Sequence, residues 1–131
     1  MSENKQIRVA AAIIKHHGQY LITQRMKQSH LGHLWEFPGG KLEANESAED
    51  CVIRECVEEI GVQVRPLFLL QEVEHQYPEA SLKLYFFVCE LISGIPSPIE
   101  CADLKWVNPN ELQNFSFPEA DLEIIKKLES L

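Results

Sequence analysis

The chain has 131 residues, of which 45% are hydrophobic and 24% charged, a composition typical of a globular protein with room for one domain. Its formal net charge of −8 argues against a nucleic-acid polymer as ligand, because proteins that bind such polymers usually present a basic surface. No apolar run approaches the roughly 20 residues that cross a bilayer, and the first residues, MSENKQIRV, lack a signal-peptide core. We expect one domain, residues 1–131, in a cytoplasmic protein without a membrane partner, and a monomer rather than a dimer.

Cysteine and histidine spacing indicates neither a disulfide framework nor a zinc site. The four cysteines form no C-x-x-C pair, and the five histidines show no zinc-ligand spacing. We expect reduced thiols packed in the interior, as in cytoplasmic proteins. The cysteines concerned are Cys51, Cys56, Cys89 and Cys101.

The first predicted elements form a hairpin followed by a loop. The mostly apolar run at residues 7–14 indicates a buried strand, and His17-Gly18 gives a turn into a second strand at residues 20–24. The polar stretch 25–34 predicts a loop, either one that could close over a ligand or a plain surface connection.

A helix is predicted at residues 48–60. Ser47 can cap its N-terminus with Asp50 three residues later, and Gly61 supplies a left-handed stop. At about 100° per residue, apolar residues fall on one side of the helix and three glutamates fall on the opposite side. The apolar set is Ile53, Cys56, Val57 and Ile60, and the acidic set is Glu55, Glu58 and Glu59.

The second half of the chain predicts three more strands. Two of them, at residues 64–74 and 82–91, are joined by a turn at 75–80 that contains a proline. A loop with one glycine and two prolines, residues 92–103, leads to a short strand at 104–107.

The chain closes with helical structure. Asn108-Pro109 opens a helical turn through Leu112, and leucine and isoleucine then recur at the spacing of an amphipathic helix. With no regular βαβ alternation, the elements favour an α/β fold of the α+β kind, in which a mixed sheet is covered on both faces. The apolar positions of the closing helix are Leu122, Ile125, Leu128 and Leu131.

The three glutamates of the predicted 48–60 helix are locally unfavourable where they stand. Glu55 and Glu59 are like charges one helical turn apart, and Glu58 and Glu59 lie at the C-terminus, where the helix dipole disfavours anions. The positive charge of Arg54 offsets part of this unfavourable energy. A solvated face is one interpretation; the other, which we favour, is a site where carboxylates bind a divalent cation such as Mg²⁺.

The spacing around this helix resembles the Nudix box, G-x5-E-x7-R-E-U-x-E-E-x-G-U with U aliphatic. Gly40 is followed after five residues by Glu46, and after seven more by Arg54-Glu55, so the box spans residues 40–62. Every fixed position is present, and the one departure is Cys56 at an aliphatic position. The resemblance implies a Nudix fold, an α/β/α sandwich with a central mixed β-sheet. It also implies a Mg²⁺-dependent (or Mn²⁺-dependent) hydrolase of nucleoside diphosphates linked to a further group.

Carried over from the family, the box also assigns roles. Arg54 would pair with Glu46 to orient the loop, and Glu55 would be the general base, with Glu59 or a metal-bound hydroxide as alternatives. Glu100, six residues before Trp106, matches an additional metal-binding glutamate of many relatives. The implied metal ligands are the Gly40 carbonyl and the carboxylates of Glu55, Glu58, Glu59 and Glu100.

Four segments that flank the box or lie elsewhere in the chain look like the MutT subgroup of this family. They are WEFPGGKLE before the helix, ITQR at 22–25, QYP at 76–78 and FPEAD at 117–121. The subgroup hydrolyses 8-oxo-dGTP to the monophosphate and pyrophosphate. By that resemblance Arg25 would contact substrate phosphate or base and Phe37 would lie beside the base. An apolar wall of the base pocket, which could equally be simple core packing, would come from Ile7, Val9 and Leu82.

Asp121 departs from the bacterial MutT pattern, which has Asn there. An Asn amide can donate to guanine O6 and accept from the N7 hydrogen of the 8-oxo form, whereas an ionised Asp121 only accepts. An acceptor suits cytosine or adenine amino groups, unless burial keeps the carboxyl protonated. CTP, 5-methyl-dCTP or a broad range of nucleoside triphosphates is therefore the alternative substrate set. A non-catalytic nucleotide-sensing module is less expected, because such modules typically lose box glutamates.

Overall fold

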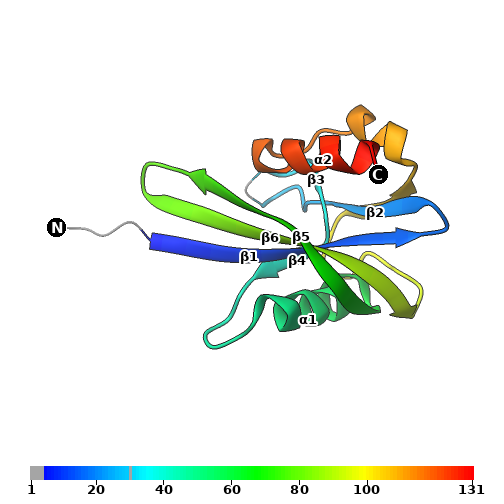
Figure 1. The fold of residues 1–131 in the computed structure, drawn as a ribbon, viewed down its shortest axis with the longest axis horizontal. Coiled ribbons are helices and arrows are strands. Elements are labelled where there is room, and N and C mark those ends of the chain that lie inside the picture. The colour runs from blue at the N-terminus through cyan, green and yellow to red at the C-terminus, as the bar shows by residue number, and fades with distance from the viewer. Residues whose placement is uncertain (1–4, 30) are drawn as a thin grey trace.

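The structure, a computed structural model, describes residues 5–29 and 31–131, and its elements form three layers (Figure 1). A twisted sheet lies in the middle, with helix α1 (Ala48–Ile60) on one face and helix α2 (Leu122–Glu129) on the other. The predicted α/β/α sandwich is confirmed. No helix in the described part of the chain is long and apolar enough to cross a membrane.

The sheet has seven strands and mixes parallel and antiparallel pairs. Its order is β3-β2-β1-β6-β5, with β4 paired to β1 and β7 paired to β2. The β1–β6 pair is parallel and the other pairs are antiparallel, as expected for a mixed sheet. The strands are β1 (Lys5–His16), β2 (Gln19–Gln24), β3 (Trp35–Glu36), β4 (Gly39–Lys41), β5 (Gln63–Gln76), β6 (Ala80–Ser93) and β7 (Asp103–Val107).

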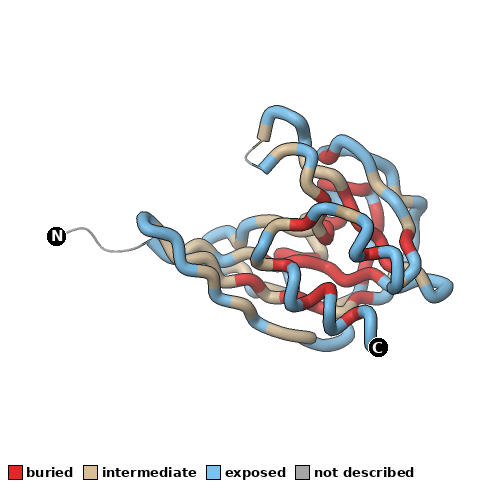
Figure 2. The backbone as a smooth tube through the Cα atoms, turned by 90° about the horizontal axis from the view of Figure 1, so that it is seen from above, coloured by how far each residue is buried: buried red, intermediate tan, exposed pale blue. Residues whose placement is uncertain are grey.

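Alternating side chains of the central strands pack into two separate hydrophobic cores. In β1, Ile13 packs in the cluster that includes α2, whereas its neighbours Ala12 and Ile14 pack in the cluster beneath α1. In β6, Phe86 and Phe87 divide in the same way. Because both faces are covered, β1 is apolar throughout its centre and shows no polar alternation. Figure 2 shows the buried residues concentrated along these central strands.

Helix α1 begins and ends where predicted, but the face that it buries against the sheet is not the predicted one. The Ser47 side chain accepts a hydrogen bond from the Asp50 N–H, and Gly61 adopts a left-handed conformation with φ 72°. The helix lies on the sheet through an arc centred on Val52 and Cys56, so Glu59 is 8% exposed while Val57 is 41% exposed. The acidic residues therefore do not form an outer stripe, because the sheet surface under α1 supplies polar partners for Glu59.

Helix α2 differs from its predicted face for a similar reason. Ile125 and Leu128 are buried as expected, but Leu122 is 49% and Leu131 65% exposed, and Ile124 is fully buried instead. A 3₁₀ turn at Glu119–Asp121 fixes where α2 begins, so Leu122 lies at its open end and Leu131 lies beyond it. The predicted helical turn after Asn108 is a 3₁₀ helix, Pro109–Asn114.

Candidate active site

Strand β4 brings two glycines between β1 and α1, at the start of the box. A Cβ atom on Gly40 would lie 2.5 Å from the carboxyl group of Glu55, and one on Gly39 would overlap the backbone of Ala10 and Ala11. Only glycine permits both approaches. The Gly40 carbonyl, a predicted metal ligand, accepts a hydrogen bond from the Cys51 thiol at 3.4 Å.

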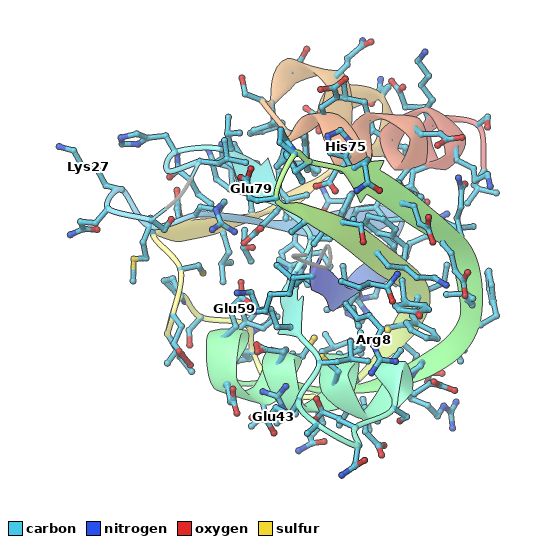
Figure 3. All side chains as sticks on the ribbon, turned by 90° about the vertical axis from the view of Figure 1, so that its left-hand side faces the viewer. Arg8, Lys27, Glu43, Glu59, His75 and Glu79 are labelled. Atoms are coloured by element: carbon cyan, nitrogen blue, oxygen red, sulfur yellow. The ribbon has the colours of Figure 1, made fainter. Side chains whose placement is uncertain are left out.

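Glu59 projects from the sheet-facing side of α1 toward the strands (Figure 3). Its Oε2 atom accepts from the Gly39 N–H at 3.2 Å, and its Oε1 atom accepts from the Thr23 hydroxyl at 3.3 Å. Burial, together with the charges of Glu36 and Glu55, raises the pKa of Glu59 to about 8 despite these two hydrogen bonds. A nearby cation would favour the ionised form of a carboxyl group that is buried in this way.

Glu55 lies one turn earlier on α1, beside Gly40. Its side chain is 18% exposed, and Arg54 Nη1 lies 3.3 Å from its Oε1 atom. Burial raises the pKa of Glu55; Arg54 opposes this, and the charges of Glu58 and Glu100 add to it. Glu55 is therefore a stronger base than an exposed glutamate.

Arg54 ties the box loop to the helix. Its Nε and Nη2 atoms form a two-pronged contact with Glu46, at 2.7 and 2.9 Å. These hydrogen bonds, with one from the Glu43 backbone, lower the pKa of Glu46 to about 2. Arg54 also donates to the Lys41 carbonyl at 3.2 Å, so one guanidinium fixes both ends of the turn between β4 and α1. The structure thus brings together the pair that the box resemblance predicts.

The loop before β7 places Glu100 near the same carboxylates. The N–H groups of Ile99 and Glu100 donate to the Glu59 carbonyl at 3.1 and 3.0 Å, and the Ser97 N–H donates to the Ile60 carbonyl at 3.0 Å. These bonds satisfy carbonyls that the end of a helix leaves unpaired. The loop is therefore docked on the C-terminus of α1 through the residues of the site.

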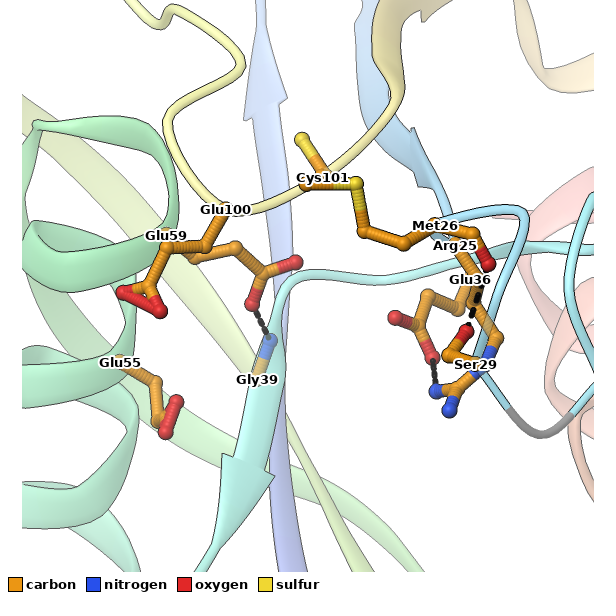
Figure 4. Close-up of a pocket in the computed structure, with 9 residues that line it drawn as sticks. All are labelled: Arg25, Met26, Ser29, Glu36, Gly39, Glu55, Glu59, Glu100 and Cys101. Atoms are coloured by element: carbon orange, nitrogen blue, oxygen red, sulfur yellow. Dashed lines mark hydrogen bonds and ion pairs between the residues drawn. The ribbon is translucent and has the colours of Figure 1, made fainter.

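A cavity of about 230 Å³ gathers most of these groups (Figure 4). Glu58 is not among the described residues that line it; its side chain is 46% exposed and lies 3.1 Å from Arg54 Nη1. We call this space the carboxylate cavity. Its lining residues are Arg25, Met26, Ser29, Glu36, Gly39, Glu55, Glu59, Glu100 and Cys101.

The donor set of this cavity suits a hard divalent cation. Glu55, Glu59 and Glu100 supply carboxylate oxygens, which Mg²⁺ prefers, and glycine at position 40 leaves the room that a Cβ would fill. Within residues 5–29 and 31–131, no three His, Cys, Asp or Glu side chains already converge closely enough to hold a metal. Arg54 Nη1 lies 3.3 Å from Glu55 Oε1 and 3.1 Å from Glu58 Oε2, so these two carboxylates share one cationic side chain of the protein.

A second cavity, of about 390 Å³, lies on the other side of Arg25 and Glu36. We call it the base cavity, and its volume lies in the usual range for small-molecule sites. Ile7, Val9 and Leu82, predicted to form an apolar wall, all line it. The other lining residues are Leu31, Lys41, Tyr77, Ala80, Ser81, Leu84, Pro118, Ala120 and Asp121.

A smaller cavity of about 190 Å³, which we call the connecting cavity, shares lining residues with both. Phe37 lines this connecting cavity but is only 3% exposed, and its ring stacks on Phe117 with centroids 5.5 Å apart. Arg25 and Glu36 line all three spaces. The three cavities therefore lie next to one another between the α1 carboxylates and Asp121, and we call this series of spaces the path.

Asp121 ends the path as a buried acid, 5% exposed. Burial and the charge of Glu36 raise the pKa of Asp121 to about 7, although Arg25 opposes the shift. Near neutral pH its carboxyl group is thus divided between a protonated donor and an ionised acceptor.

Several residues that line the path or support it were not predicted as site residues from the sequence. Glu36 and Lys41 lie within the WEFPGGKLE segment, whose charged residues flank the glycine turn and could have indicated them. Thr23 lies within the ITQR segment and Tyr77 within the QYP segment, so the same resemblance could have indicated both. Other residues that were not predicted include Met26, Ser29, Leu31 and Cys101.

Comparison with known proteins identifies the family of this chain. A family model described as "NUDIX domain" matches residues 9–127. An 8-oxo-dGTP diphosphatase of Proteus vulgaris is 44% identical over 89 residues, which cover 67% of this chain and 80% of that protein. An 8-oxo-dGTP diphosphatase of Escherichia coli (strain K12) is 32% identical over 128 residues, which cover 97% of this chain and 99% of that protein.

A CTP pyrophosphohydrolase of Escherichia coli (strain K12) is 30% identical over 127 residues, covering 97% of this chain and 94% of that protein. A solved structure from a study of MutT of Aliivibrio salmonicida and Vibrio cholerae superposes with a TM-score of 0.81 at 33% identity. That match covers 95% of this chain and 97% of the solved one. With the complete box spacing in its sequence and this similarity along most of its length, the chain belongs to the NUDIX domain family of hydrolases.

Proposed function

We propose that this Nudix hydrolase cleaves 8-oxo-dGTP to 8-oxo-dGMP and pyrophosphate, with Mg²⁺ as cofactor and Mn²⁺ as a substitute. The observation that carries the proposal is the order of the adjacent cavities, from one lined by Glu55, Glu59 and Glu100 to a largely apolar one lined by Asp121. A nucleoside triphosphate has the matching order of groups, with anionic phosphates at one end and a flat base at the other. The names of the two diphosphatase relatives support the choice of substrate.

The carboxylates of Glu55, Glu59 and Glu100, with the Gly40 carbonyl, would hold the divalent ions, and Glu58 would join them from the rim. When bound, such ions neutralise phosphate charge and lower the pKa of water. Glu55 would accept the proton of the attacking water. The water oxygen bonds to the β-phosphorus, and the bond from that phosphorus to the oxygen that bridges it to the α-phosphorus breaks. That oxygen leaves with the monophosphate, and the β- and γ-phosphates with the water oxygen leave as pyrophosphate.

A pyrimidine nucleotide such as CTP is the second candidate. Asp121 favours it, because an ionised carboxylate accepts from the cytosine amino group but cannot donate to guanine O6. The CTP pyrophosphohydrolase relative gives independent support. The raised pKa of Asp121 is compatible with 8-oxo-dGTP as well, because the protonated acid can donate a hydrogen bond to guanine O6.

The deciding experiment compares kcat/KM for 8-oxo-dGTP, dGTP, dCTP and CTP on purified protein with Mg²⁺. A preference for 8-oxo-dGTP over dGTP is the expected result. Equal values for these two would overturn the sanitation function, and a preference for CTP or dCTP would establish the second candidate. Failure to release pyrophosphate from any nucleotide would favour a nucleotide-sensing module.

The same proposal places the protein in the cytoplasm as a monomeric single domain. The four cysteines are free and buried, which supports a reducing compartment. Size-exclusion chromatography with light scattering tests the oligomeric state.

A further inference from the structure

The ion pair of Arg25 and Glu36 lies where the carboxylate cavity and the base cavity meet. Thr23 of β2 is paired with Glu36 of β3, and Arg25 follows the end of β2, so the antiparallel ladder brings the two charges together. Arg25 Nη1 lies 2.9 Å from Glu36 Oε1, and the side chains are 30% and 24% exposed. Figure 4 shows this pair across the cavity from Glu55 and Glu100.

A carboxylate at this position needs an explanation. Its charge raises the pKa values of Glu59 on one side and Asp121 on the other, so Glu36 acts electrostatically on both ends of the path. It would also repel a polyphosphate. Burial raises the pKa of Glu36 as well, and the Arg25 charge and hydrogen bond oppose that rise. Arg25 therefore offsets part of the cost of burying this carboxylate.

The geometry also indicates what Arg25 would meet. A nucleotide with its base in the base cavity and its outer phosphates at the α1 carboxylates must pass its sugar and α-phosphate through the junction. A guanidinium presents several N–H donors in a rigid plane, so one edge can bind a carboxylate while another binds a phosphate. Held on Glu36, Arg25 would be oriented before the substrate arrives.

Resting on the proposed function, we propose that Glu36 is a positioning residue whose carboxylate fixes the Arg25 guanidinium at the junction, where it contacts the α-phosphate of a bound nucleoside triphosphate. Glu36 then acts on the substrate through Arg25. A purely structural Glu36 would affect thermal stability alone, and a metal-ligating Glu36 would change the metal requirement.

The test is a double-mutant cycle with Glu36→Gln and Arg25→Ala, assayed on the best nucleotide substrate. Glu36→Gln should lower kcat/KM by about tenfold to a hundredfold, the range for losing a charged hydrogen bond, mainly through a higher KM. The Mg²⁺ concentration for half-maximal activity should not change. The double variant should be no worse than Arg25→Ala alone, because both changes remove one interaction.

A matched control is Glu90→Gln, which removes the acid of the exposed Arg65–Glu90 pair on the β5–β6 hairpin and should leave kcat/KM unchanged. Glu36→Asp keeps the charge and should recover part of the loss. If Glu36→Gln lowers Tm severely, Glu36→Asp is compared with wild type and with Arg25→Ala instead. The proposal would be overturned if Glu36→Asp had the kcat/KM of wild type while Arg25→Ala was impaired.

Three other results would also overturn it: unchanged kcat/KM in a folded Glu36→Gln protein, additive losses in the cycle, or a shifted Mg²⁺ requirement. A wild-type protein that hydrolyses no nucleotide would remove the proposed function, and this inference with it.

Discussion

The carboxyl group of Glu55 occupies the space in which a side chain at position 40 would begin, 2.5 Å from the place of a Gly40 Cβ. This relationship links the first fixed residue of the box to the glutamate that follows Arg54, with 14 intervening residues (41–54) in the sequence. Glycine is required there because a carboxylate needs the room.

Alanine substitutions at the two adjacent glycines should have different effects. Gly40→Ala would push aside the flexible end of Glu55, so we expect a large loss of kcat with a small change in Tm. Gly39→Ala would overlap backbone atoms of β1, which cannot move as easily, so we expect a clear loss of stability. Thermal unfolding and steady-state kinetics on both variants separate the outcomes. Equal effects on Tm would contradict the assignment.

Glutamine substitutions should rank the box glutamates by position. Glu55→Gln removes the proposed general base inside the carboxylate cavity, and kcat should fall by about 10²-fold to 10⁴-fold. Glu58→Gln alters a more exposed carboxylate at the rim, so its loss should be smaller. Both proteins should keep the wild-type Tm within a few degrees. A Glu58→Gln loss as large as that of Glu55→Gln would show that the rim carboxylate enters the reacting complex.

Arg54→Lys should weaken the site even though it keeps the charge. Lysine cannot reproduce the two-pronged contact with Glu46 or reach the Lys41 carbonyl at the same time. We expect activity to fall about 10-fold to 100-fold, the usual cost of losing a residue that orients metal ligands. Arg65→Lys, at an exposed ion pair outside the site, is the control and should behave as wild type.

Metal-free protein should lose stability as pH rises, in part through Glu59. Its pKa in the folded protein is about 8 against an ordinary 4.5, so the folded state holds the proton more tightly. The stabilisation is complete below pH 4.5 and is lost as pH rises to about 8. Tm of wild type should fall across this range, and Glu59→Gln should reduce the slope. Mg²⁺ should raise the wild-type Tm most at pH 8; no metal effect there would argue against a cation beside Glu59.

Asp121 should make base selectivity depend on pH. Burial raises its pKa from 3.8 to about 7, so it can donate below that pH and only accepts above it. The ratio of kcat/KM for 8-oxo-dGTP to that for CTP should therefore decrease as pH rises through 7. Asp121→Asn should remove this dependence, and should raise Tm at pH 8 more than at pH 5 because it removes an ionised buried acid. A constant wild-type ratio would contradict the role of Asp121.

Local sequence determined the ends of α1, the β1–β2 hairpin and the spacing of the box, because caps, glycine stops and turn residues act over a few positions. The two-residue strand β3 and the three-residue strand β4 are too short for any alternation to show. Helical periodicity also assigned the wrong face to Val57 and Glu59, because exposure on a helix depends on what packs against it.

Only the tertiary structure could decide which charges meet. Glu59 is buried because Thr23 and Gly39, on two other elements, supply donors for it. Glu36 lies beside Arg25 because β3 pairs with β2, and both residues line the cavity that Asp121 also lines. The sequence by itself determined the chemical groups, since their spacing in the box is local. Their burial, pKa values and common cavity depend on contacts between segments far apart in the chain, which no local pattern encodes.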